Sequence, residues 1–346
     1  MPKNLLAADL NHILDHTRDL WEELRGERIF ITGGTGFFGC WLLESFAWAN
    51  QHLNLNAQAF VSTRSPKIFQ KKALHLAQNK NIQFVSGDLL DLEFPTGAFS
   101  HIIHAAAIQA GAQSPDFDFV EQFHANVSAT QRVLEFARIN GAKKFLFTSS
   151  GAVYGKQPPE ISHIPETYRG APDTTDVRSV YGQSKRASEY LCTAYAHQCG
   201  ITATIARCFA FVGPYLPLDA NYAIGNFIQA ASCSRPIHIN GDGTPYRSYL
   251  YAADLAIWLW TILIKGQACR PYNVGSENDV TIMQLAQEVA KELSPQSTIQ
   301  TANQPVEGKL VERYVPSTQR ARQELGLETW VSLKEAIHRT ANFHSR

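Results

Sequence analysis

Short apolar runs alternate with stretches of helical periodicity over most of the chain, and this alternation predicts the fold. Apolar runs typical of buried strands lie at 27–34, 57–63, 81–88, 101–107, 143–150 and 202–208. Apolar residues recur at helical spacing over 37–50, 127–141 and 179–200, and again near 281–293 and 332–343. Strands that alternate with helices form a parallel sheet covered on both faces. We therefore expect an α/β fold built on a Rossmann-type, doubly wound parallel sheet.

The same pattern divides the chain into three parts. Residues 4–25 carry apolar side chains at helical spacing, so we expect 1–26 to form a helical extension that packs on the core. We assign 27–211 to a dinucleotide-binding Rossmann domain, to which 249–274 return. From residue 212 onwards the alternation is interrupted, so we assign most of 212–346 to a smaller α/β substrate-binding domain.

One long segment interrupts the regular pattern inside the first domain. The stretch 156–178 is rich in proline and polar residues, which predicts a loop. Loops of this length in a compact domain usually cover a functional site. We expect this loop, together with 214–226, to shape the substrate site.

Composition and charge exclude several classes of function. The 346 residues include 31 Lys plus Arg and 31 Asp plus Glu, a formal charge of +0, so no basic field favours nucleic acid or an anionic membrane as partner. The six cysteines form no CxxC pair, so we expect a reduced, cytoplasmic protein without a metal site. No apolar run reaches membrane-spanning length, and the N-terminal residues lack an apolar signal core.

A glycine-rich turn lies between the first expected strand and the first helix after it. Its spacing is Gly33-x-x-Gly36-x-x-Gly39. Glycines at such a turn allow a tight bend, close approach of a pyrophosphate to the backbone and close packing of helix on strand. The N-terminus of the following helix favours the phosphate charge. The turn therefore predicts a dinucleotide site.

The end of the second strand bears on the choice of coenzyme. An Asp or Glu usually stands there when the ribose 2′-hydroxyl is bound, but 57–63 ends without an acid and Arg64 follows. An arginine at this place pairs with a 2′-phosphate; a solvent-facing side chain is the alternative. We favour NADP(H), with NAD(H) as the alternative. Asp88, after the third strand, either binds the adenine amine or caps a turn.

Candidate chemistry is concentrated in Tyr181-x-x-x-Lys185 and in Ser150 at a strand end. A tyrosine and a lysine four residues apart lie on one face of a helix. A nearby ammonium stabilises phenolate and so lowers the pKa of the tyrosine. Such a tyrosine can move a proton at neutral pH while a serine hydroxyl holds the substrate oxygen. This set suits hydride transfer at a carbinol or carbonyl carbon.

Further motifs in the same order give the chain a family resemblance. They are His104-Ala-Ala-Ala107, Asn126, Ser149-Ser150-Gly-Ala-Val-Tyr-Gly155, Gly213-Pro214 and Arg247-x-x-Leu-Tyr-x-x-Asp254. Together with the glycine turn and Tyr181-x-x-x-Lys185, they resemble the extended short-chain dehydrogenases/reductases over most of residues 27–345. Within these, the chain is most similar to the nucleotide-sugar epimerase/dehydratase/reductase group.

The resemblance implies roles for the matched positions. Tyr181 is implied as the acid/base, Lys185 as the residue that lowers its pKa and holds the nicotinamide ribose, and Ser150 as the hydroxyl on the substrate oxygen. The implied coenzyme contacts are Gly33, Thr35, Gly36, Phe37, Phe38, Gly39, Arg64, Asp88, Leu89, Ala105, Ala106, Tyr181 and Lys185. The implied substrate contacts are Ser149, Ser150, Asn226 and Arg247. For Asn226 a helix cap is the alternative, and for Arg247 a surface arginine.

Departures from the family pattern bear on the reaction. The 4,6-dehydratases that the chain resembles carry an Asp-Glu pair just after the catalytic hydroxyl, and the decarboxylases carry the glutamate. This chain has Gly151 and Ala152 there, which carry no acid or base. Many relatives have an asparagine where this chain has Ala210, which puts the usual contact to the diphosphate or sugar there in doubt.

The sequence thus favours a nucleotide-sugar oxidoreductase that transfers hydride at C4 of a 4-keto sugar nucleotide. An NAD-dependent nucleotide-sugar 4-epimerase stays open, since neither reaction needs an acid at 151 or 152. A non-catalytic dinucleotide-binding scaffold is a third hypothesis, which the intact Tyr181 and Lys185 disfavour. By resemblance, we expect a homodimer formed through the helices that contain 126–140 and 181–199.

Overall fold

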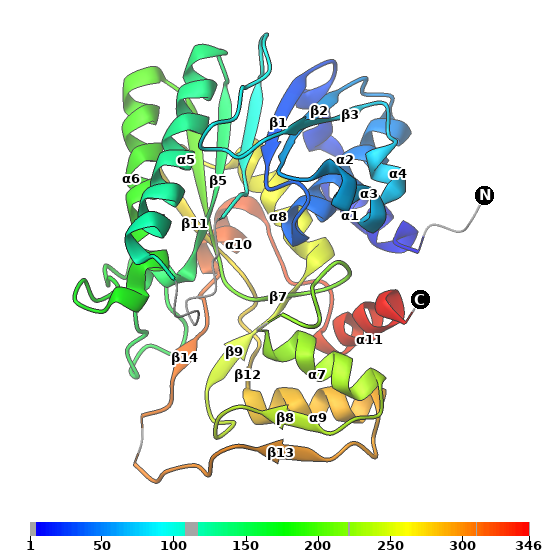
Figure 1. The fold of residues 1–346 in the computed structure, drawn as a ribbon, viewed down its shortest axis with the longest axis vertical. Helices are drawn as coiled ribbons and strands as arrows, with labels where there is room; N and C mark the ends of the chain where they lie inside the picture. Colours follow the sequence, from blue (N-terminus) through cyan, green and yellow to red (C-terminus); the bar gives the residue numbers. More distant parts are fainter. Residues whose placement is uncertain (1–4, 108–116, 221, 309, 346) are drawn as a thin grey trace.

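A seven-stranded parallel sheet forms the centre of the molecule and confirms the expected fold class (Figure 1). The computed structural model describes residues 5–107, 117–220, 222–308 and 310–345. The strand order is β11-β6-β5-β4-β1-β2-β3. These strands are β1 (Arg28–Thr32), β2 (Gln58–Thr63), β3 (Ile82–Ser86), β4 (His101–His104), β5 (Lys144–Ser150), β6 (Thr202–Cys208) and β11 (Pro271–Val274). The order reverses between β1 and β4, and ligands of such sheets bind at the carboxyl ends of the strands beside this reversal.

Helices cover both faces of the sheet, as the sequence pattern predicts. On one face lie α2 (Phe37–Leu53) and α8 (Ala252–Lys265); on the other lie α5 (Phe119–Ile139) and α6 (Val180–Cys199). Both α6 and α8 contact β5 and β6, and α5 packs beside α6. Almost every residue of α8 is buried, which fits a helix that is apolar all round. Two short helices, α3 (Pro66–Lys72) and α4 (Leu74–Ala77), follow β2.

The N-terminal segment is helical and packs on the core domain. The helix expected over 4–25 begins at Ala7 as α1 (Ala7–Thr17) and changes to a 3-10 helix over Arg18–Leu24. Leu10, Ile13 and Leu14 of α1 are buried, and α1 contacts α2 and α8. The extension therefore covers part of α2 and α8.

The C-terminal part builds a smaller α/β unit, at the bottom of Figure 1. Its elements are β7 (Phe211–Val212), α7 (Ala223–Ser232), β8 (Ile237–Ile239), β9 (Tyr246–Ser248), β10 (Leu250–Tyr251), β12 (Asp279–Thr281), α9 (Ile282–Leu293), β13 (Ile299–Thr301), β14 (Arg313–Tyr314) and α11 (Leu333–His344). The helices expected near 281–293 and 332–343 are α9 and α11. Between these elements the chain returns to the main sheet through α8 and β11, and α10 (Gln319–Leu325) packs on β11. None of the helices described here is long and apolar enough to cross a membrane.

Candidate active site

The glycine turn brings two pieces of backbone so close together that only glycine fits. Gly33 has a φ of +69°, and a Cβ atom there would lie 2.6 Å from the backbone nitrogen of Ala106. A Cβ atom at Gly39 would lie 2.2 Å from the backbone of Gly34. Gly36, the N-cap residue of α2, has no side chain that could accept from the first turn. These features fit a pyrophosphate bound at the start of the helix.

The first residues of α2 are Phe37 and Phe38, both predicted coenzyme contacts. Their side chains are half-buried, and the ring of Phe38 packs edge-on against Phe211 with 5.0 Å between the ring centroids. Because the rings pack against the apolar core, the predicted coenzyme contact would be made by their backbone in the first turn of the helix.

The carboxyl end of β2 lies against the glycine turn and carries positive charge. The hydroxyl oxygens of Thr35 and Thr63 lie 3.4 Å apart. Arg64 follows Thr63 directly and is exposed. Lys72 of α3 donates from Nζ to the carbonyl oxygen of Thr35 at 3.3 Å. The sequence reasoning missed Lys72, because its position on a separate helix hides its proximity to the turn.

Asp88 and Leu89 form the turn after β3. Asp88 Oδ1 accepts from the backbone N–H of Leu90 at 3.0 Å, so this carboxylate caps the turn, as one of the two interpretations predicted. Arg132 of α5 donates from Nε to the carbonyl oxygen of Leu89 at 2.8 Å and fixes the turn to the helix.

Ala105 and Ala106 continue the chain beyond β4 and face the glycine turn. Their N–H groups donate to the carbonyl oxygen and the hydroxyl of Thr32, at 3.2 and 3.1 Å. The same hydroxyl lies 2.7 Å from Nδ1 of the buried His104, whose Nε2 lies 3.1 Å from the hydroxyl of Thr130. Burial, with Lys185 as a smaller cause, lowers the pKa of His104 to about 3. His104 is thus neutral and joins β4 to β1 and α5.

Lys185 of α6 lies beside Tyr181 and is bonded to β5, the strand that ends at Ser150. Lys185 is buried, donates from Nζ to the carbonyl oxygen of Thr148 at 2.7 Å, and lies 5.8 Å from the centroid of the Tyr181 ring. Burial lowers the pKa of Lys185 to about 8. The lysine therefore remains mostly protonated at neutral pH, beside the phenol that it is predicted to tune.

Tyr314 of β14 joins this group, although no sequence motif pointed to it. Its hydroxyl lies 3.5 Å from Ser150 Oγ, which also accepts from the N–H of Ala152 at 3.1 Å. A Cβ atom at Gly151 would lie 2.7 Å from the Tyr314 hydroxyl and 2.8 Å from the ring of Phe209. The absence of a side chain at position 151 thus leaves room for a second phenol. Burial raises the pKa of Tyr314 above its ordinary value, which keeps this phenol protonated.

Ser149 points to the opposite side of β5 from Ser150, because side chains alternate along a strand. Its hydroxyl donates to Oε1 of Glu189 at 2.6 Å, and both residues are buried. Arg207 donates to both oxygens of the same carboxylate, at 3.0 and 2.7 Å. The structure therefore places Ser149 in a buried ionic cluster and does not bring it to the side of the sheet where Ser150 meets Tyr314.

Arg247 reaches the neighbourhood of Tyr314 from β9. Its guanidinium lies 5.9 Å from the centroid of the Tyr314 ring and donates to Glu312 at 2.5 Å. The Arg247 side chain is 25% exposed and that of Glu312 is 57% exposed, so the ion pair is open to an incoming anion.

Asn226 supports a loop in the structure. In the amide orientation that its surroundings favour, Nδ2 donates to the carbonyl oxygens of Leu218 and Ala220 at 2.8 Å each. This is a structural use of the side chain, closer to the cap interpretation than to a substrate contact. No group of three or more His, Cys, Asp or Glu among the described residues is arranged to hold a metal ion.

Comparison with known proteins decides the family. The sequence matches the NAD dependent epimerase/dehydratase family over residues 29–275. The chain belongs to this family. UDP-glucuronic acid decarboxylase 1 of Arabidopsis thaliana is 29% identical over 324 residues, which cover 92% of this chain and 70% of the relative. UDP-glucuronic acid decarboxylase 1 of Danio rerio is 26% identical over 320 residues, covering 92% and 73%.

Solved structures of similar fold include epimerases. A UDP-glucose 4-epimerase from Thermotoga maritima with UDP-glucose superposes with a TM-score of 0.74 at 22% identity, covering 92% of this chain and 98% of the other. A UDP-glucuronic acid 4-epimerase from Bacillus cereus, in complex with UDP-glucuronic acid and NAD, gives 0.76 at 23% identity, covering 91% and 98%. At this identity the likeness establishes the fold.

Family membership makes the chain an enzyme of the NAD-dependent epimerase/dehydratase type and confirms the resemblance found in the sequence. It leaves the reaction to be argued from the site. Decarboxylases are among the relatives by sequence, yet Gly151 and Ala152 hold no carboxylate at the positions where the sequence analysis expects one in that branch.

Proposed function

We propose that the protein is a nucleotide-sugar oxidoreductase that works at C4 of a 4-keto sugar nucleotide. The observation that carries this proposal is that Lys185 lies beside Tyr181 and is bonded to β5, the strand that ends at Ser150, with no carboxylate at positions 151 and 152. Elimination of water or loss of carbon dioxide needs a further acid or base near the sugar, whereas reduction at C4 needs one hydride and one proton.

The side chains divide this chemistry between them. When bound, NADP(H) supplies or accepts the hydride. Tyr181 gives its proton to the C4 oxygen, and the Lys185 ammonium lowers the free energy of the phenolate that forms. Ser150 and the protonated Tyr314 phenol lie 3.5 Å apart and offer two hydroxyls for the same sugar.

The charge around β2 supports NADP(H) as the coenzyme. Thr63 replaces the acid that would bind a 2′-hydroxyl and repel a 2′-phosphate. Arg64 and Lys72 place two cations around the contact between Thr35 and Thr63. A coenzyme that must be exchanged in every cycle suits a reductase.

An NAD-dependent 4-epimerase is the second candidate. The open position at Gly151 and Ala152 suits it equally, because epimerisation also needs only hydride and proton transfer at one carbon. The buried Lys185 beside Tyr181 disfavours a non-catalytic scaffold. Burying an ammonium group lowers the stability of the fold, and binding of a dinucleotide alone does not require it.

For the substrate we propose a nucleoside diphosphate sugar whose diphosphate replaces Glu312 beside Arg247. We also propose a homodimer that uses the outer faces of α5 and α6. Light scattering of the purified protein tests the dimer: a mass near 77 kDa, twice the 38.5 kDa of the chain, is expected.

The deciding experiment is to denature freshly purified protein and identify the released coenzyme by mass spectrometry. An empty site, or exchangeable NADPH, supports the reductase and leads to a panel of 4-keto sugar nucleotides, scored by loss of NADPH absorbance. Near-stoichiometric NAD would instead support the epimerase and contradict the assignment of Arg64 and Lys72.

A further inference from the structure

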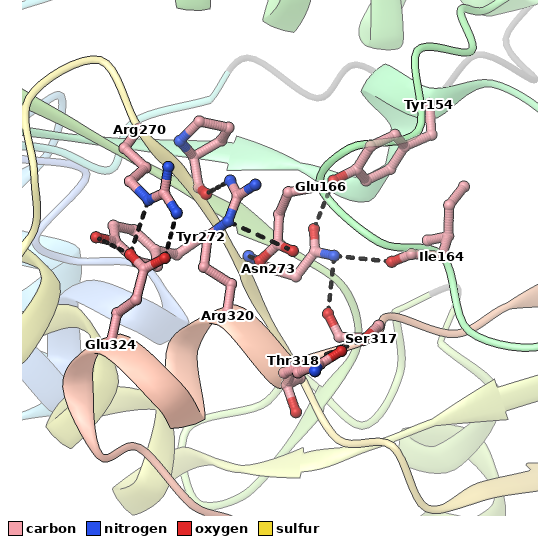
Figure 2. A network of polar contacts seen from close by, with 12 residues as sticks. Tyr154, Ile164, Glu166, Arg270, Tyr272, Asn273, Ser317, Thr318, Arg320 and Glu324 are labelled. Carbon is pink, nitrogen blue, oxygen red and sulfur yellow. Dashed lines mark hydrogen bonds and ion pairs between the residues drawn. The ribbon is translucent and has the colours of Figure 1, made fainter.

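A buried asparagine joins three segments that surround the Ser150–Tyr314 contact. Asn273 of β11 is fully buried, and its side chain makes three hydrogen bonds (Figure 2). Oδ1 accepts from the Tyr154 hydroxyl at 2.7 Å, and Nδ2 donates to the carbonyl oxygens of Ile164 and Ser317 at 2.8 and 3.0 Å. Its backbone N–H donates to the carboxylate of Glu166 at 2.9 Å.

The bond to Tyr154 reaches one side of the Ser150–Tyr314 contact. Tyr154 ends the 3-10 turn Gly151–Tyr154, which begins directly after Ser150. The Tyr154 ring is buried and lies 6.3 Å from the ring of Phe209, which in turn lies 4.7 Å from the ring of Tyr314. A shift of Tyr154 would therefore displace the backbone beside Ser150. Through the ring of Phe209, it would also displace the ring of Tyr314.

The bonds from Asn273 to Ile164 and Ser317 reach the other side of the Ser150–Tyr314 contact, where Tyr314 lies. Ile164 pairs with the segment that follows Tyr314: its N–H donates to the carbonyl oxygen of Val315, and its carbonyl oxygen accepts from the N–H of Ser317, both at 2.9 Å. Asn273 donates to both carbonyl oxygens at the end of this pairing. It thereby fixes the strand that carries Tyr314 and part of the 156–178 loop.

We propose that Asn273 is a positioning residue for the sugar site, which acts through Tyr154 and β14 to set the spacing between Ser150 and Tyr314. This rests on the proposed function, in which those two hydroxyls bind the sugar. Loss of the Asn273–Tyr154 bond then weakens binding of the sugar moiety while leaving the diphosphate and coenzyme sites intact. A merely structural role would lower stability without this selectivity.

Tyr154→Phe is the decisive variant, because it removes the hydroxyl that donates to Asn273 and keeps the ring. Asn273→Ala removes all three, including the donor to the Ser317 carbonyl oxygen and the acceptor for the buried Tyr154 hydroxyl, so it can fail to fold. Tyr272→Phe is the matched control: Tyr272 is the preceding residue of β11, equally buried, and its hydroxyl donates to Glu324 of α10 at 3.1 Å. Figure 2 shows this contact on the side of the network away from Tyr154.

Calorimetry on these proteins would compare UDP, UDP-glucose and NADPH as probes. We expect Tyr154→Phe to raise the Kd of UDP-glucose about tenfold, which corresponds to the loss of one buried hydrogen bond. The Kd values of UDP and NADPH should stay within about twofold of those of the wild type. Tyr272→Phe should change none of the three. The proposal would be overturned if Tyr154→Phe bound UDP and UDP-glucose with equally reduced affinity, or if its affinity for UDP-glucose were unchanged.

Hydrogen exchange keeps this test separate from the proposed function. Exchange in 151–155 and 312–318 should rise in Tyr154→Phe. In Tyr272→Phe it should rise only in 319–326 and at Gln267, whose backbone N–H donates to the Tyr272 hydroxyl. If the wild-type protein binds neither UDP nor UDP-glucose, the exchange pattern alone decides the positioning role. An unchanged hydrogen-exchange pattern in Tyr154→Phe would overturn the positioning role of Asn273.

Discussion

At the scale of single residues, the proposed reaction depends on the phenol of Tyr181. Tyr181→Phe should lower kcat by about 10²–10⁴-fold, because proton transfer by a positioned side chain contributes that much. The affinity for NADPH should stay within about twofold, since the ring and Lys185 remain. Steady-state turnover and a fluorescence titration with NADPH would measure both effects.

A control for this variant lies on the same helix. Tyr190 of α6 is 73% exposed, so Tyr190→Phe makes the same chemical change away from the site. It should leave kcat unchanged. Turnover retained in Tyr181→Phe would show that another group provides the proton.

Coenzyme choice is also decided by individual side chains. Arg64→Ala and Lys72→Ala should each raise the Kd of NADPH about tenfold, because each removes one charge-assisted contact to a 2′-phosphate. The Kd of NADH should change little. Lys80→Ala is the control, since this exposed lysine lies before β3, at the opposite end of the strand from the coenzyme turn. An equal effect on both coenzymes would refute the 2′-phosphate assignment.

At the scale of elements, α2 and α4 are joined by a contact between a histidine and a buried carboxylate. His75 of α4 lies 2.8 Å from the buried carboxylate of Glu44 in α2, which also accepts from Tyr215 at 2.5 Å. The hydrogen bond to Glu44 raises the pKa of His75 above its ordinary value of 6.5. The native state thus binds the proton more tightly than the unfolded chain does.

This contact predicts a stability difference with a definite sign. The stabilisation by His75 is fully present below pH 6.5 and is lost as pH rises through the higher native pKa. Because 58% of the side chain is exposed, solvent screening keeps the effect below about 1 kcal/mol. His75→Gln should therefore lower the Tm more at pH 5.5 than at pH 8, as thermal unfolding would measure. The same Tm difference at both values would contradict this linkage.

At the scale of the whole molecule, the N-terminal extension stabilises the coenzyme-binding half without touching the site. Ile13 is buried against the core, so Ile13→Ala should cost about 2–5 kcal/mol of unfolding free energy. The exposed neighbour Asp15 provides the control, because Asp15→Ala should change stability by less than about 0.5 kcal/mol. Urea denaturation measures both. The NADPH affinity of folded Ile13→Ala should equal that of wild type; a loss would link the extension to the site.

Local sequence was sufficient for the parallel sheet, its flanking helices and the position of the coenzyme turn. These depend on apolar periodicity and on the conformational freedom of glycine, which act over a few residues. Ser150 and the Tyr181–Lys185 pair were also found locally, from a strand end and from one face of a helix. Their catalytic roles stay predictions until the variants are measured.

Tertiary structure alone decided which distant side chains share the site. Tyr314 contacts Ser150 although it lies 164 residues further along the chain. It occupies space that a side chain at Gly151 would fill, whereas the sequence alone showed only that position 151 lacks an acid. Lys72 joins the coenzyme turn through the path of α3, and Ser149 faces Glu189 because side chains alternate along β5. Such contacts depend on how far-separated segments pack, because the chain reversals that bring them together leave no periodic signal in the sequence.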